Sequence, residues 1–240
     1  MAEVLGEAVH VWLCRVDTVP DPDMLARCAQ LLDAVETRRW QRYRFDKDRH
    51  LFLVAHALLR STLSRYADVD PARWRFRLQE FGRPEVAGPQ TNLDLRFNLS
   101  HTRGLAVVLV TLGTDCGVDV EPADRSVDIE SLARRNFADS ERTDVLARAD
   151  EDQRRRFLEY WTLKESYIKA RGVGLALPLT KFTMTIGDRV TIAFDPAIDD
   201  DPADWQFHLV RPTATHQLAV AVRRGPALDR PVVVRETTMT

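Results

Sequence analysis

One helical segment of this chain carries charges where a helix face should be apolar. It runs Trp-Thr-Leu-Lys-Glu-Ser-Tyr-Ile-Lys, from Trp161 to Lys169. On a helix that advances about 100° per residue, its apolar stripe comprises Phe157, Tyr160, Trp161, Leu163, Tyr167, Ile168 and Ala170. Lys164 falls in the middle of this stripe, and Glu165 and Lys169 lie along its edge. A buried cation is costly unless it meets an anion or reaches water. The pattern therefore predicts an anionic partner, and a phosphate with its metal ion fits.

A short strand upstream supplies matching acidic groups. From Gly117 to Glu121 the side chains alternate, so Asp119 and Glu121 share one face. Two carboxylates about 6–7 Å apart along a strand repel each other unless a cation lies between them. Mg²⁺ prefers such oxygen ligands and completes its shell with water and substrate phosphate. We expect a Mg²⁺ site made by Asp119 and Glu121, with Glu165 as a third ligand.

Composition excludes several classes of protein. The 240 residues, 45% of them hydrophobic, can form one large domain or two of about 110 residues. No apolar run reaches the ~18 residues of a membrane span, and no signal-peptide pattern opens the chain, so we expect a cytoplasmic protein. The three cysteines lie far apart, in no metal-binding pattern. A net charge of −2 argues against a general nucleic-acid binder.

The order of helices and strands suggests two halves. Strands are expected at Val9–Val16, Phe76–Leu78, Leu105–Leu112, Gly117–Glu121, Phe182–Ile186, Val190–Phe194, Trp205–Leu209 and Leu218–Arg223. Helices are expected at Asp21–Arg44, from Asp46 to about Tyr66, at Ser131–Ala149, and around Lys164 up to Gly172. The apolar strand after His101 resembles the one after His216. We therefore expect an α+β protein with an N-terminal half at 1–113, a C-terminal half at 114–225 and a poorly ordered tail at 226–240.

Further polar groups precede the strand at Leu105. Ser100 and His101 there fit a phosphate clamp, and a turn with local hydrogen bonds is the competing interpretation. A catalytic serine with His101 as its base fits poorly, because no Gly-x-Ser-x-Gly loop is present. Basic clusters around Arg38–Arg49 and at Arg154–Arg156 are either solvated helix faces or local attractors of an anionic partner.

Together these pieces resemble the 4′-phosphopantetheinyl transferases, of the long single-chain type. The matching pieces are Arg39-x-x-Arg42-Tyr43, Phe45-x-x-Asp48-Arg49, Phe81-Gly-Arg83-Pro84, Phe97-Asn-Leu-Ser100-His101, Gly117-Val-Asp119-Val-Glu121 and Trp161-x-x-Lys164-Glu165-x-x-x-Lys169-x-x-Gly172-x-Gly174-Leu175. The last two are the most specific. The trimeric synthases of the superfamily are about half as long, so the long class fits better.

The resemblance implies two similar α+β halves related by a pseudo-twofold axis, with coenzyme A bound between them. It implies that Asp119, Glu121 and Glu165 hold Mg²⁺ against the pyrophosphate. Lys164 and Lys169 would add positive charge there. The remaining nucleotide contacts would come from Arg39, Arg42, Arg83, Ser100 and His101, chiefly at the 3′-phosphate.

The resemblance also implies a reaction and a partner. A serine of an apo acyl or peptidyl carrier protein attacks the β-phosphorus of coenzyme A, and 3′,5′-ADP leaves. Lys164 would stabilise developing charge, and Glu165 is a candidate proton acceptor. We expect a monomer with no nucleic acid or membrane as partner. The sequence does not identify the carrier, and fatty-acid, polyketide, nonribosomal peptide and siderophore systems all remain open. Arg134, Arg135 and Arg154–Arg156 are candidates for docking the acidic carrier.

Two positions depart from the family pattern. Glu36 stands where relatives often have a basic residue, and Phe52 where some have a hydroxyl near the 3′-phosphate.

A non-catalytic coenzyme A-binding or nucleotide-binding module is the main alternative function, but such a module would not need the three carboxylates. A different Mg²⁺ phosphotransferase lacks support, because the chain has no Gly-x-x-x-x-Gly-Lys-Ser/Thr loop.

Overall fold

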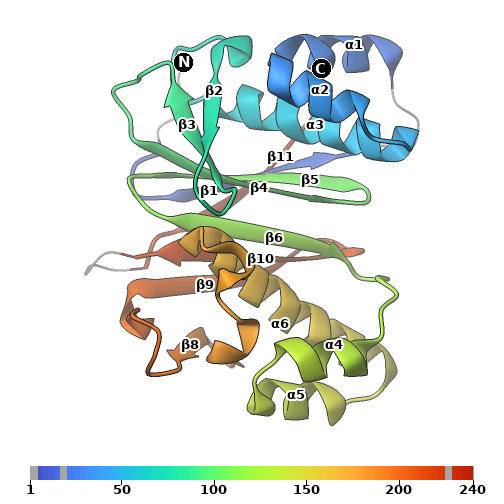
Figure 1. The fold of residues 1–240 in the computed structure, drawn as a ribbon, viewed down its shortest axis with the longest axis vertical. Helices are drawn as coiled ribbons and strands as arrows, with labels where there is room; N and C mark the ends of the chain where they lie inside the picture. Colours follow the sequence, from blue (N-terminus) through green and yellow to red (C-terminus); the bar gives the residue numbers. More distant parts are fainter. Residues whose placement is uncertain (1–4, 17–20, 225–228, 240) are drawn as a thin grey trace. The chain divides into compact units, whose positions relative to one another are not determined.

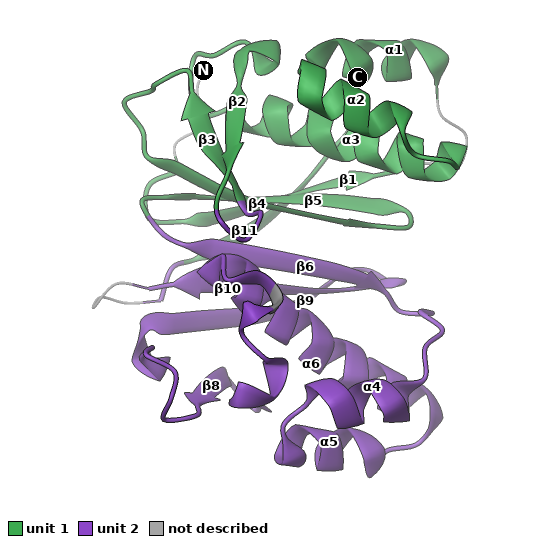
Figure 2. Ribbon diagram, viewed as in Figure 1, with its two compact units in different colours: residues 1–79, 84–113, 231–240 green, residues 80–83, 114–230 purple. Residues whose placement is uncertain are grey.

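The chain divides into two compact units in the computed structural model, which describes residues 5–16, 21–224 and 229–239. Unit 1 comprises residues 1–79, 84–113 and 231–240, and unit 2 comprises residues 80–83 and 114–230 (Figure 2). The main division falls between Gly113 and Thr114, where the sequence suggested a junction.

Unit 1 is a four-stranded sheet with helices packed on it. Its elements are β1 (Val9–Arg15), α1 (Pro22–Leu31), α2 (Ala34–Gln41), α3 (Asp46–Leu63), β2 (Arg75–Leu78), β3 (Pro84–Gly88), β4 (Leu95–Thr102), β5 (Leu105–Leu112) and β11 (Val232–Thr237) (Figure 1). The sheet order is β11-β1-β5-β4, and β2 and β3 form a separate hairpin. The apolar stripe predicted after Asp46 packs the long helix α3 onto β5, β4 and β1.

Unit 2 repeats this plan with a three-stranded sheet. Its elements are β6 (Cys116–Pro122), α4 (Ile129–Asn136), α5 (Asp139–Leu146), α6 (Asp150–Arg171), β7 (Phe182–Ile186), β8 (Val190–Phe194), β9 (Trp205–Thr213) and β10 (His216–Arg223). The sheet order is β6-β10-β9, and β7 and β8 form a hairpin. Its core contains a group of aromatic residues, in which Tyr167 packs against Phe182 and Trp205, with ring centroids 4.8 and 4.9 Å away.

The two units share one order of elements. Each has a strand, two short helices, a long helix, a separate hairpin and then an antiparallel pair that joins the first strand. The corresponding sheets are β1-β5-β4 and β6-β10-β9. β5 and β10, whose sequences resemble each other, occupy the same place in this order. The expectation of a mixed α+β protein with two similar halves is confirmed.

Two sequence-based expectations need correction. The single helix expected at 21–44 is two helices, because Asp33 caps α2: its side chain accepts from the Val35 and Glu36 amides, and Glu36 reaches back to the Asp33 amide. The tail expected to be poorly ordered contains β11, which pairs in parallel with β1 from Val9↔Val232 onward. Residues 225–228 and 240 lie outside the described residues.

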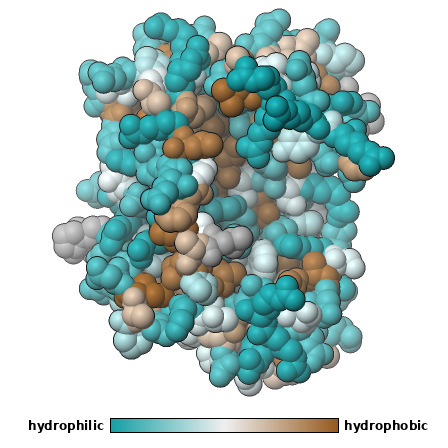
Figure 3. All heavy atoms as spheres, viewed as in Figure 1, coloured by the Kyte–Doolittle hydropathy of each residue, from teal (hydrophilic) through white to brown (hydrophobic). Residues whose placement is uncertain are grey.

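The surface matches the composition. Hydrophilic side chains predominate on the face in Figure 3, with smaller apolar areas between them. Within the described ranges, no helix is both long enough and apolar enough to cross a membrane.

Candidate active site

A close approach of β6 to α6 places the predicted acidic groups together. A Cβ atom at Gly117 would lie 2.0 Å from the Ser166 carbonyl oxygen and 2.5 Å from the Ala170 amide nitrogen. Only glycine fits there, so the strand lies directly against the helix backbone. Because side chains alternate along a strand, the residues that share this face of β6 with Gly117 are Asp119 and Glu121. Both predicted carboxylates therefore point to the α6 side.

Cations from the same unit already contact these carboxylates. Lys169 donates to Asp119 Oδ1 at 2.7 Å and to the Val118 carbonyl at 3.2 Å. Arg125 forms an ion pair with Glu121 Oε1. The guanidinium carbon of Arg125 also lies 5.1 Å from the ring centroid of Trp161 on α6. The edge of α6 that carries Lys169 thus faces the carboxylate strand.

Glu165 interacts electrostatically with Asp119 of the same cluster. Burial raises the pKa of Glu121 to about 7, and the negative charge of Asp119 adds to the effect. Burial and the charge of Asp119 also raise the pKa of Glu165. Lys169 and Arg125 oppose both shifts. Glu121 and Glu165 each interact with the negative charge of Asp119, and this arrangement favours an added cation.

The donor set fits a hard divalent ion. Carboxylate oxygens on a strand and a helix are the ligands that Mg²⁺ accepts, and a cation beside Asp119 would relieve the repulsion that this carboxylate exerts on Glu121 and on Glu165. Over the described residues, no three His, Cys, Asp or Glu side chains form a ready metal cage. Asp119 and Glu121 are instead turned toward Lys169 and Arg125.

Lys164 has a different partner from the one predicted. Its ammonium is fully buried and pairs with Glu141 of α5 at 2.8 Å. It also donates to the carbonyls of Leu179 at 2.7 Å and Phe182 at 2.6 Å. These acceptors use all three hydrogens of the ammonium, so none remains for a phosphate. Burial lowers the pKa of Lys164 to about 8, although the charge of Glu141 opposes this shift. The expected anion is therefore a side chain of the protein, Glu141, and the assignment of Lys164 to phosphate binding and catalysis stays a prediction that this pairing does not support.

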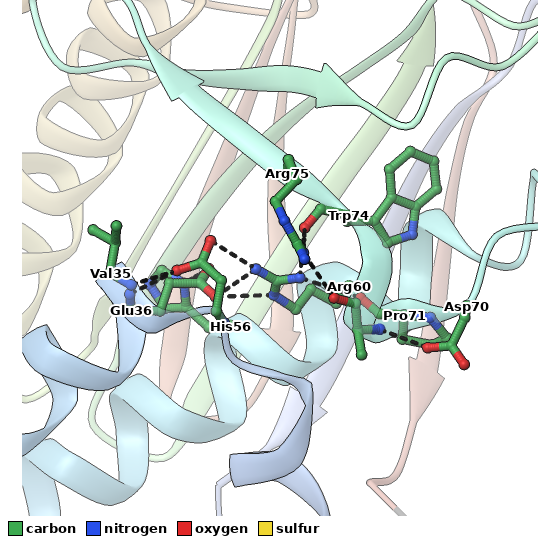
Figure 4. A network of polar contacts seen from close by, with 10 residues as sticks. Val35, Glu36, His56, Arg60, Asp70, Pro71, Trp74 and Arg75 are labelled. Atoms are coloured by element: carbon green, nitrogen blue, oxygen red, sulfur yellow. Dashed lines mark hydrogen bonds and ion pairs between the residues drawn. The ribbon is translucent and has the colours of Figure 1, made fainter.

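In unit 1, the departure at Glu36 belongs to a buried polar network. Glu36 accepts from Arg60 at 2.6 Å and contacts His56 Nδ1 at 2.8 Å. Figure 4 shows Arg60 between Glu36 and the carbonyls of Pro71 and Trp74, to which it also donates. The guanidinium is fully buried, so Glu36 supplies the charge that makes its burial tolerable.

Phe52, the second position that departs from the family pattern, holds one predicted nucleotide-binding residue, Arg39. The Phe52 ring stacks on His56, with centroids 4.0 Å apart, and the guanidinium carbon of Arg39 lies 5.4 Å from the Phe52 centroid. A cation over an aromatic face is held without losing its hydrogen-bond donors. Arg42 follows as the C-cap residue of α2.

Ser100 and His101 lie on β4 itself and not on a turn before a strand. Ser100 is buried and pairs with Val107 of β5, whereas His101 is exposed. Neighbouring residues of a strand point to opposite faces, so the regular strand does not bring these two side chains together.

Arg83, predicted at the nucleotide end of coenzyme A, lies in the part of the β2–β3 connection that belongs to unit 2. Its side chain is 7% exposed and donates to the Ala170 carbonyl in the last turn of α6. Its Nε atom is buried without a hydrogen-bond partner. Arg83 therefore supports the end of the helix that carries Glu165 and Lys169.

Comparison with known proteins identifies the family of this chain. A family model described as the 4′-phosphopantetheinyl transferase superfamily matches residues 115–222, and one described as 4′-phosphopantetheinyl transferase, N-terminal, matches residues 19–112. The 4′-phosphopantetheinyl transferase HetI of Nostoc sp. is 34% identical over 173 residues, which cover 72% of each chain. The chain belongs to the 4′-phosphopantetheinyl transferase family.

Other relatives of this transferase family include Sfp of Bacillus subtilis. It is 31% identical over 160 residues, which cover 67% of this chain and 69% of the relative. Among solved structures, the holo-[acyl-carrier-protein] synthase of Thermotoga maritima gives a TM-score of 0.37 at 22% identity, covering 46% of this chain and 62% of that one.

Two residues of this phosphopantetheinyl transferase, Arg125 and Glu141, were not predicted from the sequence as partners of the site residues. Arg125 lies four residues after Glu121, a spacing that signals an ion pair only where the chain turns back, as it does here from Pro122 to Arg125. Glu141 carried a local signal as the third residue of α5, where its side chain accepts from the Ala138 amide at 2.8 Å. Its pairing with Lys164 depends on the fold.

Proposed function

We propose that this protein transfers the 4′-phosphopantetheine group of coenzyme A to a serine of an apo acyl or peptidyl carrier protein. The transfer depends on Mg²⁺ and releases 3′,5′-ADP. The observation that carries the proposal is the meeting of Asp119 and Glu121 on β6 with Glu165 and Lys169 on α6. Membership of the transferase family supports it, since the relatives are named as enzymes of this reaction class.

The three carboxylates of this site would hold the ion, which supplies positive charge beside the diphosphate. Lys169, whose side chain is 29% exposed, adds a second positive charge there. The serine oxygen forms a bond to the β-phosphorus, and the bond to the bridging oxygen breaks, so negative charge develops on 3′,5′-ADP. Fixed cations beside that oxygen lower the barrier because they need no reorganisation. Glu165, which is half-buried on α6, is also the candidate acceptor of the serine proton, directly or through water.

Unit 1 would hold the nucleotide end of coenzyme A. Arg39 is held over Phe52 with its donors available, and Arg42 lies at the end of the same helix. Ser100 and His101 would contribute from β4. Arg83, which belongs to unit 2, is the further residue that the resemblance assigns to the nucleotide. These assignments rest on the resemblance of the motifs.

A hollow in unit 2 is a candidate place for the carrier protein. It has a volume of about 430 Å³, and its walls include Arg154, Arg155 and Arg211 together with Asp124, Glu151 and Asp152. Gln217, another wall residue, pairs with Glu121 in the sheet, so the hollow adjoins the carboxylate cluster. Among described residues, Arg154 and Arg211 make no ion pair, which leaves both charges available to an acidic carrier. The resemblance further implies a monomer acting in the cytoplasm, and light scattering after gel filtration would test the oligomeric state.

Mass spectrometry of carrier proteins tests the proposal. Incubation with Mg²⁺, coenzyme A and a panel of apo carriers should add the phosphopantetheine mass to a serine of at least one carrier. Asp119→Ala and Glu165→Ala should abolish transfer and keep the circular dichroism spectrum of the wild type. Near-normal rates in both variants would refute the metal site. Coenzyme A binding without transfer to any carrier would favour the non-catalytic binding module.

A further inference from the structure

We propose that Arg125 is a built-in substitute for the metal ion: it neutralises Glu121 in the metal-free protein and leaves that carboxylate when a divalent cation binds. The inference deepens the proposed function, because it rests on the carboxylate cluster as the metal site. It assigns to Arg125 control over how tightly the site binds its ion.

The chain path brings Arg125 back to the strand that it follows. β6 ends at Pro122, and a turn closes there with a hydrogen bond of 3.0 Å from the Arg125 amide to the Pro122 carbonyl. The Ala123 amide is fixed to the Thr215 carbonyl at 2.8 Å. This short, anchored turn returns the guanidinium to Glu121, whose side chain is 18% exposed.

Charge balance explains why the cluster needs such a residue. Asp119, Glu121 and Glu165 carry three negative charges when ionised, and the positive charges that act on them come from Lys169 and Arg125. Without Arg125 the metal-free cluster would be strongly repulsive. With a divalent ion in place the guanidinium is surplus, and its charge repels the ion. Mg²⁺ also demands close octahedral ligands, so a guanidinium on Glu121 Oε1 competes with the ion for that oxygen.

The two cations are held differently. The Lys169 ammonium has a second acceptor in the Val118 carbonyl, at 3.2 Å, so it is fixed to the backbone of the strand. The second contact of Arg125 is the face of Trp161. A ring face attracts a guanidinium without a directional hydrogen bond. The Arg125 side chain can therefore swing from Glu121 along the indole, whereas Lys169 stays in place.

Removing the guanidinium gives a test with two readouts besides transfer. Arg125→Gln should bind Mn²⁺ about tenfold more tightly than the wild type, a change that corresponds to ~1.4 kcal/mol, as measured from the electron paramagnetic resonance signal of free Mn²⁺. The variant should also unfold at a lower temperature than the wild type in EDTA, and this difference should vanish in saturating Mg²⁺. The matched control is Arg142→Gln, which removes an ion pair with Asp139 on α5 and should leave Mn²⁺ affinity unchanged.

The outcomes separate this inference from the function on which it rests. Unchanged or weaker Mn²⁺ binding by Arg125→Gln, with normal binding by the wild type, overturns the substitute role and leaves the metal site standing. A stability loss that persists equally in saturating Mg²⁺ also overturns it, because the ion pair then survives metal binding. Failure of both proteins to bind Mn²⁺ and to transfer phosphopantetheine overturns the proposed function as well.

Discussion

The buried pair of Lys164 and Glu141 offers a direct test of how α6 is held in unit 2. Lys164→Met keeps the volume of the side chain and removes its charge. It leaves Glu141 buried without its cation and leaves the Leu179 and Phe182 carbonyls without their donor. Breaking a fully buried ion pair by removing one partner costs about 3–5 kcal/mol, so the variant should lose that much stability against unfolding.

A double-mutant cycle isolates the pair. Glu141→Gln keeps an oxygen for the Met184 amide, which donates to Glu141 Oε1 at 2.6 Å. The double variant Lys164→Met, Glu141→Gln should be more stable than the sum of the single losses predicts, with a coupling of about 1–3 kcal/mol. Urea unfolding followed by tryptophan fluorescence supplies the free energies, and transfer by the folded fraction is measured in parallel. If Lys164→Met stays within about 1 kcal/mol of the wild type but loses transfer, the structural role is refuted and the phosphate role is restored.

Three further predictions concern the carboxylate strand and the nucleotide end. Gly117→Ala should destabilise by about 1–3 kcal/mol or more in thermal unfolding, because its Cβ atom would lie 2.0 Å from the Ser166 carbonyl oxygen; a wild-type melting temperature would contradict the close approach. Because the pKa of Glu121 is raised to about 7, the folded metal-free protein binds this proton more tightly than the unfolded chain. The stability that this proton provides is complete below about pH 4.5 and is lost as pH rises through 7. In EDTA, Glu121→Gln should therefore lose less stability than the wild type between about pH 5 and pH 8. Equal slopes of unfolding free energy against pH in the two proteins would count against the raised pKa. Arg39→Gln should raise KM for coenzyme A about tenfold and leave KM for 3′-dephospho-coenzyme A unchanged. An equal rise in KM for both substrates would show that Arg39 does not contact the 3′-phosphate.

The sequence predicted most of the fold because the governing signals were local. Val190–Phe194 and Phe182–Ile186 form strands with the predicted bounds, and α6 ends where Gly172 adopts a left-handed conformation with φ of 64°. The strand β11 could not be predicted in this way. Its pairing with β1 joins residues more than 200 positions apart, and its sequence has no clear periodicity to mark it.

The site was predictable in one unit for a specific reason. Alternation along β6 places Asp119 and Glu121 on one face, and helical periodicity places Glu165 and Lys169 on one edge, so two local rules sufficed. Which anion meets Lys164 is not a local property. Periodicity showed that this lysine must be buried, but Glu141 lies 23 positions earlier, on another helix.

The two lysines of α6 therefore have different roles: Lys164 stabilises the fold, and Lys169 is placed for the proposed reaction. Lys164 and Lys169 are five positions apart, so their side chains point about 140° away from each other. One is fully buried with every donor used, and the other is partly exposed beside the carboxylates. A fixed charge can stabilise a reacting phosphate only if the helix beneath it does not move, because catalysis by electrostatics depends on preorganisation. Lys164 holds α6 to α5 and to the segment before β7, and Gly117 holds the same helix to β6. Loss of Lys164 should consequently lower transfer as well, through displacement of Lys169 and Glu165. The two roles are distinguished by stability, which should fall further in Lys164→Met than in Lys169→Met, because the Lys164 side chain is fully buried and that of Lys169 is 29% exposed.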